Sequence, residues 1–139
     1  MKKIPFIMIV VWGIAVLCTL FLSSCKRPEV LDNSTLVNSA RNVALTFGPA
    51  YVPFFKEANV SDIQVFKKKD YGGDSRPQIR KQIGRKFYTV TFTYDSTAVK
   101  FDFGFAARVR IWKDTGEPLD VIFGNGWGRN FFFLSFKEQ

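Results

Sequence analysis

The stretch KFYTVTFTY, residues 86–94, decides the fold, because the character of its side chains alternates along the chain. Large apolar side chains fall on one side of an extended backbone and threonines fall on the other; the apolar set is Tyr88, Val90, Phe92 and Tyr94. A period of two, built from β-branched and aromatic residues, is typical of a strand with one buried face. The sequence therefore predicts an antiparallel sheet that is covered on one side.

Similar alternation occurs on both sides of this stretch. Residues 62–66 predict a short strand before it, and residues 99–112, 119–123 and 131–136 predict strands after it. Within residues 99–112, Gly104 is expected to mark a bend or bulge; the inward set is Phe101, Phe103, Phe105, Ala107, Val109 and Ile111. Turn-forming residues separate these runs. We expect a curled sheet of about five strands.

The segment before the strands has a helical period. Across residues 36–58 the apolar side chains recur at steps of three and four, which places them on one face of a helix. Asn33 or Ser34 is the expected N-cap. Gly48, the proline after it and Pro53 oppose a straight helix. We therefore expect a kinked helix, or a helix pair broken near Gly48, packed on the sheet.

The predicted fold class is α+β, with the helix as the cover of the sheet. A small all-β barrel of the oligonucleotide-binding type is the alternative, and it requires residues 36–58 to be largely non-helical. The order of a helix followed by strands resembles the cystatin-like and nuclear-transport-factor-like layouts. This resemblance concerns the order of elements only.

The first 25 residues have the layout of an export signal. Two lysines are followed by an uncharged apolar run, residues 4–22, and then by two serines and a cysteine. A run of this length is also long enough for a retained membrane span. The motif Leu22-Ser23-Ser24-Cys25 resembles the lipobox of bacterial lipoproteins. The resemblance implies cleavage before Cys25 and a diacylglycerol on its thiol, as in other acylated, palmitate-bearing proteins of the cell envelope.

The lipobox implies three parts: a signal peptide at 1–24, a lipidated tether at 25–34 and one globular domain at 35–139. The resemblance also implies that Lys26, the residue after the lipidated cysteine, favours the outer over the inner membrane. Cys18 follows two bulky residues and should leave with the peptide, so no cysteine pair remains for a disulfide. Because the chain has no histidine either, we expect no metal site and no cofactor.

The densest charge lies in residues 67–86. This segment contains only two acidic residues, Asp70 and Asp74, and eight basic ones. The basic residues are Lys67, Lys68, Lys69, Arg76, Arg80, Lys81, Arg85 and Lys86. The signal peptide removes two of the 20 basic residues and none of the 12 acidic ones, so the mature net charge is 18 − 12 = +6. Such a balance favours anionic partners, which in an envelope are headgroups, cell-wall polymers and acidic protein faces, not nucleic acid. The alternative is a solvated loop, because residues 70–84 contain many breakers and too few apolar residues to pack.

A second candidate binding segment is the glycine-rich stretch 124–130. Its aromatic and amide side chains suit stacking on a sugar ring or a peptide; the residues are Asn125, Trp127, Arg129 and Asn130. The glycine spacing does not match a dinucleotide-binding loop, and a strand follows it, not a helix. The alternative is a hairpin loop whose tryptophan folds back on the core.

No catalytic signature emerges from the sequence. Asp114-Thr115-Gly116 matches the triplet of aspartic proteases, but Lys113 stands where an apolar strand end is needed, so a hairpin turn is favoured. The Asp95-Ser96-Thr97 run lacks a histidine to act as base.

We therefore expect a non-catalytic, monomeric lipoprotein that binds an anionic or protein partner at the membrane surface. An inhibitor or immunity lipoprotein against a hydrolase is the alternative. A hydrolase is the third candidate, and it requires Asp102 and Asp120 to meet in one concave pocket.

Overall fold

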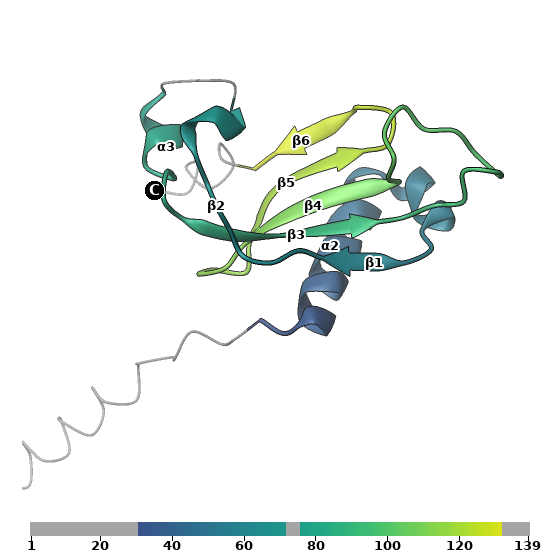
Figure 1. Cartoon of the computed structure of the whole chain (residues 1–139), viewed down its shortest axis with the longest axis horizontal. Helices are drawn as coiled ribbons and strands as arrows, with labels where there is room; N and C mark the ends of the chain where they lie inside the picture. Colours follow the sequence, from purple (N-terminus) through teal and green to yellow (C-terminus); the bar gives the residue numbers. More distant parts are fainter. Residues whose placement is uncertain (1–30, 72–75, 132–139) are drawn as a thin grey trace, which may run out of the picture. The chain divides into compact units, whose positions relative to one another are not determined.

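The computed structural model describes residues 31–71 and 76–131, and within them one helix precedes an antiparallel sheet (Figure 1). The elements are α2 (Asn33–Phe47), the 3₁₀ helix η1 (Pro49–Phe54), β1 (Ala58–Val60), β2 (Gln64–Val65), the 3₁₀ helix η2 (Lys68–Tyr71), α3 (Pro77–Arg80), β3 (Lys86–Phe92), β4 (Ala107–Trp112), β5 (Pro118–Phe123) and β6 (Gly128–Asn130). The predicted α+β class is confirmed. The predicted signal peptide, Cys25 and most of the tether lie outside the described residues.

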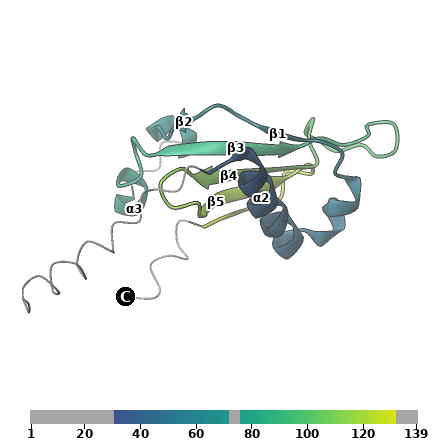
Figure 2. The same cartoon turned by 90° about the horizontal axis from the view of Figure 1, so that it is seen from below.

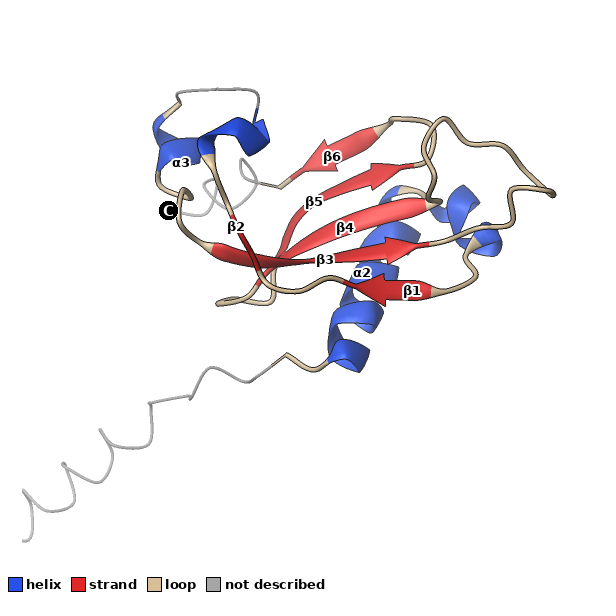
Figure 3. Cartoon of the chain, in the orientation of Figure 1, coloured by secondary structure: helices blue, strands red, loops and turns tan. Residues whose placement is uncertain are grey.

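The sheet has six strands in the order β1-β3-β4-β5-β6, and β2 also pairs with β3 (Figure 3). All pairs are antiparallel, and β1 and β6 do not meet, so the sheet is open. The barrel alternative is therefore wrong. No helix in the described ranges combines the length and the apolar character that a membrane crossing requires.

β1 and β2 lie along the same edge of β3, with an interruption between them. Val60 pairs with Val90 and Gln64 pairs with Phe87. The chain therefore advances four residues along this edge while β3 advances three, so the edge contains one extra residue. Ser61 fills the interruption: its hydroxyl oxygen accepts a bond from the N–H of Thr89 at 3.0 Å, and its own N–H donates to the carbonyl of Thr89 at 2.9 Å. A side chain thus takes the place of a backbone acceptor at this bulge.

α2 begins one or two residues earlier than predicted. The N-cap is Asp32, whose carboxylate accepts a bond from the N–H of Thr35 at 2.7 Å, so the prediction of Asn33 or Ser34 is wrong. The helix ends at Phe47, and its C-cap is Gly48, whose N–H donates to the carbonyl of Ala44. The predicted break near Gly48 is confirmed, because η1 follows it directly.

The main core lies between α2 and one face of the sheet (Figure 2). From α2 it takes one stripe, Leu36, Ala40 and Ala44, as the helical period predicts. From the sheet it takes alternating residues of three strands and one residue beyond β6: Val90, Phe92, Ala107, Val109, Ile111, Val121, Phe123 and Phe131. Val90 and Phe92 of β3 and Ala107, Val109 and Ile111 of β4 are buried there as predicted, and Tyr88 packs against them. Tyr94 lies beyond β3, and the inward prediction for Phe103 is wrong, because this residue is 45% exposed.

A second core covers one end of the opposite face, where the sequence predicted only solvent. Phe66 and Ile79 are fully buried there, from the segment expected to be an unpacked loop. They pack with Phe87, Trp112 and Leu119, which the sheet turns away from α2. Leu119 reaches this side because it is an extra residue in β5: Arg110 pairs with Asp120, and Ile111 pairs with Pro118.

Several strand boundaries differ from prediction. β1 is not among the predicted strands, β2 covers only Gln64–Val65 of the predicted 62–66, and β3 ends at Phe92, not at Tyr94. β4 begins at Ala107, not at residue 99, because residues 102–106 bend around the end of β5. Gly124 permits this approach: a Cβ there would lie 2.5 Å from the carbonyl oxygen of Phe105 and 2.6 Å from the ring of Phe101. The last strand begins at Gly128, not at Phe131; the rest of the predicted strand 131–136 lies outside the described residues.

Candidate functional site

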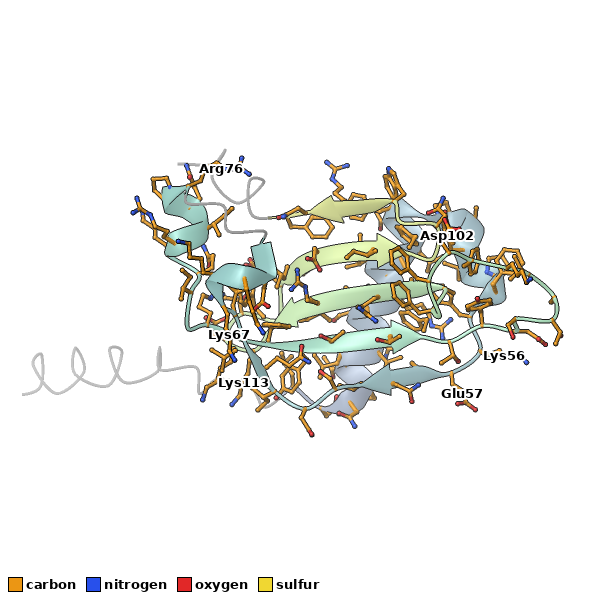
Figure 4. All side chains as sticks on the ribbon, turned by 45° about the horizontal axis from the view of Figure 1, so that its top comes forward. Lys56, Glu57, Lys67, Arg76, Asp102 and Lys113 are labelled. Atoms are coloured by element: carbon orange, nitrogen blue, oxygen red, sulfur yellow. The ribbon has the colours of Figure 1, made fainter. Side chains whose placement is uncertain are left out.

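Labelled charged residues lie at both ends of the sheet (Figure 4). Lys67, Arg76 and Lys113 lie at one end, and Lys56 and Asp102 lie at the other. We call the first the basic end and define it by the exposed cations Lys67, Lys68, Lys69, Arg76, Arg80, Lys81, Lys86 and Lys113. We call the second the aromatic end and define it by Tyr51, Phe54, Phe101, Phe103 and Trp127.

At the basic end the lysine run opens a packed 3₁₀ turn. The N–H of Lys67 donates to the carboxylate of Asp70 at 2.7 Å, and the N–H of Asp70 donates to the carbonyl of Lys67 at 3.0 Å. Because the preceding Phe66 is fully buried, the three lysines project from an anchored point of the chain.

The next cations are carried by the short helix α3. Arg76 precedes its first residue, Pro77; Arg80 is its last residue and Lys81 its C-cap. Ile79 holds this helix in the second core while Arg80 and Lys81 are exposed. The cations of residues 67–86 therefore lie on the outside of a small packed unit, and the solvated-loop alternative is wrong for the described part.

Arg85 differs from the other predicted cations because it has a structural role. Its guanidinium donates two bonds to the carboxylate of Asp114, at 2.6 and 3.0 Å, and one to Gln82 at 2.5 Å. Its carbon Cζ also lies 4.0 Å from the centre of the Trp112 ring. These bonds hold the pKa of Asp114 below its usual value. Arg85 thus fastens the second core to the β4–β5 hairpin.

The Asp114-Thr115-Gly116 triplet forms that hairpin, as the turn interpretation predicted. Gly116 has a φ of 72°, and its N–H donates to the carbonyl of Trp112 at 2.9 Å. The hydroxyl oxygen of Thr115 accepts from the N–H of Glu117 at 3.3 Å.

The four residues predicted in the 124–130 stretch do not converge on one point. The side chain of Asn125 accepts a bond from the N–H of Trp127 at 3.2 Å and so shapes the β5–β6 turn. Arg129 lies on the α2 side, with its Cζ 4.9 Å from the ring centre of Phe47. Asn130 pairs with Asp120, which faces away from α2. Of the four, Trp127 alone belongs to the aromatic end as defined above.

Trp127 is both packed and exposed. Its ring stacks on the buried ring of Phe123, with centroids 5.4 Å apart and planes 23° apart, yet 48% of the residue remains accessible. Tyr51 stacks on the same Phe123 ring at 4.6 Å. The prediction that the tryptophan folds back on the core therefore holds for one side of its ring.

Two further exposed rings at this end were missed by the sequence reasoning. Phe54 is 40% exposed and touches Phe101 edge-on at 5.8 Å. Phe103 is 45% exposed and stacks on Phe105 at 5.4 Å. The sequence signals are Pro53, which opposes a straight helix, and Gly104, which interrupts the alternation of residues 99–112.

The aromatic end is stiffened by a polar contact at its base. Asp95 accepts bonds from the hydroxyl and the N–H of Thr97, at 2.6 and 3.0 Å, and from the ammonium of Lys56 at 3.0 Å. The Thr97 hydroxyl first, and then Lys56, lower the pKa of Asp95. Asp95 is therefore charged at neutral pH and joins the loop after β3 to the segment after η1.

The carboxylates that a hydrolase would need are not brought together. Asp102 is exposed in the bend before β4, and its neighbour Phe103 donates its N–H to the carbonyl of Gly124. Asp120 lies four residues before Gly124 on the chain, about 13 Å along an extended strand, and Arg110 holds its carboxylate in a buried ion pair. Within residues 31–71 and 76–131, no group of three potential ligands could hold a metal ion.

Comparison of this chain with protein families, with curated proteins and with solved structures finds no match.

Proposed function

We propose that this protein is a lipid-anchored, non-catalytic binding module of the bacterial envelope, and that it contacts a protein partner through the aromatic end. One observation carries the proposal: Phe54, Phe103 and Trp127 are each 40–48% exposed at the same end of the domain. Exposed aromatic patches mark interaction surfaces, and aromatic side chains are enriched in protein–protein interfaces.

The exposed rings are held in place before any partner arrives. Trp127 rests on Phe123, Phe54 on Phe101, and Phe103 on Phe105. A side chain that is already fixed loses little conformational entropy on binding, so more of its burial appears as affinity. Because 40–48% of each residue is accessible, covering one of them buries on the order of 60–120 Å², less than half of what a fully buried aromatic side chain contributes.

The anchor rests on the lipobox resemblance at Cys25. From Cys25 to Leu31, the first described residue, is six residues (31 − 25), which span at most about 20 Å when extended. A partner must therefore lie at or near the membrane that holds the lipid.

A photo-crosslinking amino acid placed at position 103 or 127 tests the binding surface in cells. We expect an adduct of one defined mass from both positions, and none from position 45, where the exposed Leu45 of α2 provides a matched control. The same adduct pattern at all three positions, or no adduct at 103 and 127, would contradict the proposed surface. Intact-mass measurement of the extracted protein tests the anchor separately, because Cys25→Ser should abolish the added diacylglycerol.

An inhibitor or immunity lipoprotein against a hydrolase remains the second candidate. The favouring observation is the loop between β3 and β4, which projects past the end of the sheet (Figure 1) and is tied by the Asp95–Lys56 pair. A projecting, fastened loop is suited to filling a cleft in another protein. An adduct at position 103 whose partner is a hydrolase, together with loss of that enzyme's activity on addition of the protein, would support it.

A further inference from the structure

We propose that the basic end is a docking surface for the anionic phospholipid headgroups of the membrane that carries the anchor. This inference rests on the proposed lipid anchor and adds to it a second membrane contact, made by the folded domain itself. In this arrangement the basic end contacts the bilayer and the aromatic end contacts the partner.

The lysines of the basic end are accessible to an external ligand. Lys67, Lys68, Lys69, Lys81 and Lys86 are all exposed, and among the described residues none of them forms an ion pair. The nearby carboxylate of Asp114 is already bound to Arg85, and Asp70 accepts from the backbone of Lys67. The positive charge of these five lysines is therefore available to an external anion.

The second argument is the presence of aliphatic side chains among these cations. Val65 is 42% exposed and pairs with Lys86 in the β2–β3 register, and Ile83, 45% exposed, follows the C-cap Lys81 by two residues. Cations mixed with exposed aliphatic residues are typical of surfaces that rest on a bilayer, where the charges meet headgroups and the apolar groups enter the interface.

The third argument is where the chain leaves the domain. The side chain of Leu31 lies 3.6 Å from a Cβ placed on Gly116, so the N-terminal end of the domain touches the β4–β5 hairpin. That hairpin is bonded to the start of β3, because the N–H of Lys113 donates to the carbonyl of Lys86 at 2.9 Å. A tether of about 20 Å from Cys25 thus holds the basic end, and not the aromatic end, close to the bilayer.

The opposite end favours the same orientation. The labelled acidic residues Glu57 and Asp102 lie there (Figure 4), while the carboxylate of Asp95 is paired with the ammonium of Lys56. An anionic membrane surface attracts the basic end and repels these carboxylates. The exposed rings of the aromatic end are then directed away from the lipid.

Amine footprinting of the full-length, lipidated protein tests the orientation. The protein is inserted into nanodiscs of pure phosphatidylcholine or of phosphatidylcholine with phosphatidylglycerol, treated with an amine-reactive ester and digested for mass spectrometry. With phosphatidylglycerol, the lysines of the basic end should react several times more slowly, while Lys56 and Lys100 react equally in both discs. Because salt at about 1 M shortens the screening length to about 3 Å, it should remove the protection.

A matched pair of double variants gives the magnitude. Each surface lysine contributes about fivefold to binding an anionic bilayer, so Lys68→Gln with Lys69→Gln should lower the docking constant about 25-fold and expose Lys81 and Lys86 to the reagent. Lys56→Gln with Lys100→Gln removes the same charge from the other end and should leave the protection unchanged.

Equal reactivity of the basic end in both kinds of disc would overturn the proposal. Protection that is equally strong in pure phosphatidylcholine would overturn it too, because it indicates a contact that does not read lipid charge, such as one between two copies of the chain. Neither result would bear on the lipid at Cys25 or on crosslinking at position 127, so failure of this inference is distinct from failure of the proposed function.

Discussion

Replacing Gly48 by alanine should destabilise the domain and disturb the aromatic end together. A Cβ on Gly48 would lie 2.3 Å from the ring carbon Cζ of Phe123, and 2.4 and 2.9 Å from two other atoms of that ring. Normal carbon–carbon contact is about 3.5–4.0 Å. Phe123 cannot yield freely, because it is fully buried and its ring is stacked by Tyr51 and Trp127.

The overlap exceeds 1 Å, so the ring or the helix end must move. Inserting a methyl group into a packed core costs about 1–3 kcal/mol, and the buried, doubly stacked ring places this site near 2–3 kcal/mol. For a domain of this length that corresponds to a fall in melting temperature of about 10 °C. Phe123→Leu shortens the side chain and alone should cost about 1.5 kcal/mol. The double variant should cost about 2 kcal/mol, less than the sum of the two single changes.

Urea denaturation of the chain from Lys26 to Gln139, followed by circular dichroism, measures these costs. Gly104→Ala is the matched control, since a Cβ there meets nothing within 4 Å, and it should stay within about 0.5 kcal/mol of the parent. The reasoning is refuted if Gly48→Ala is as neutral as this control, or if the costs of Gly48→Ala and Phe123→Leu simply add.

Three further predictions follow from individual contacts. Asp32→Ala removes the side-chain N-cap of α2 and should cost about 1 kcal/mol in urea denaturation; no loss would mean that the cap lies elsewhere. Arg110→Met leaves the buried carboxylate of Asp120 without its ion-pair partner and should cost about 3 kcal/mol, most of which Asp120→Leu should restore in the double variant; an additive loss would contradict the ion-pair argument. The pKa of Asp95 is lowered, mainly by the hydroxyl of Thr97, so the ionised carboxylate adds stability that is complete above the ordinary pKa of 3.8 and declines as the pH falls below it. Asp95→Asn should therefore reduce the fall in melting temperature between about pH 4 and pH 2. An unchanged slope in the variant would contradict this assignment.

The main layer of the fold could be predicted because local periodicity and burial agree there. The helical stripe from Leu36 to Ala44 and the alternating set from Val90 to Phe92 meet in one core, and each can be recognised without the other. The second core could not be predicted, because its members are scattered singly through segments that look polar. Ile79 sits among cations, and Leu119 faces that core only through a bulge that period-two alternation cannot anticipate.

The two candidate sites also differ in how much of them the sequence can predict. Charge density points to the cations of the basic end, since a run such as Lys67-Lys68-Lys69 is visible in the sequence. It could not separate Arg85 from them, because its partner Asp114 lies 29 residues away. The aromatic end depends on distant segments meeting at the end of β5, where Gly124 permits the contact with Phe101. Contacts between distant segments are set by tertiary packing. In the sequence they are marked only by breaks in the periodicity, here at Pro53 and Gly104.

The extra residue at Ser61 has a consequence for behaviour under crowding. At high local density, a long, regular sheet edge can pair with the edge of a neighbouring molecule and start a polymer. Here the edge formed by β1 and β2 is split into runs of three and two residues, and the Ser61 hydroxyl occupies the backbone N–H of Thr89 at the split. The bulge thereby shortens the stretch of that edge that could pair with another strand, and so protects the domain against self-association through it.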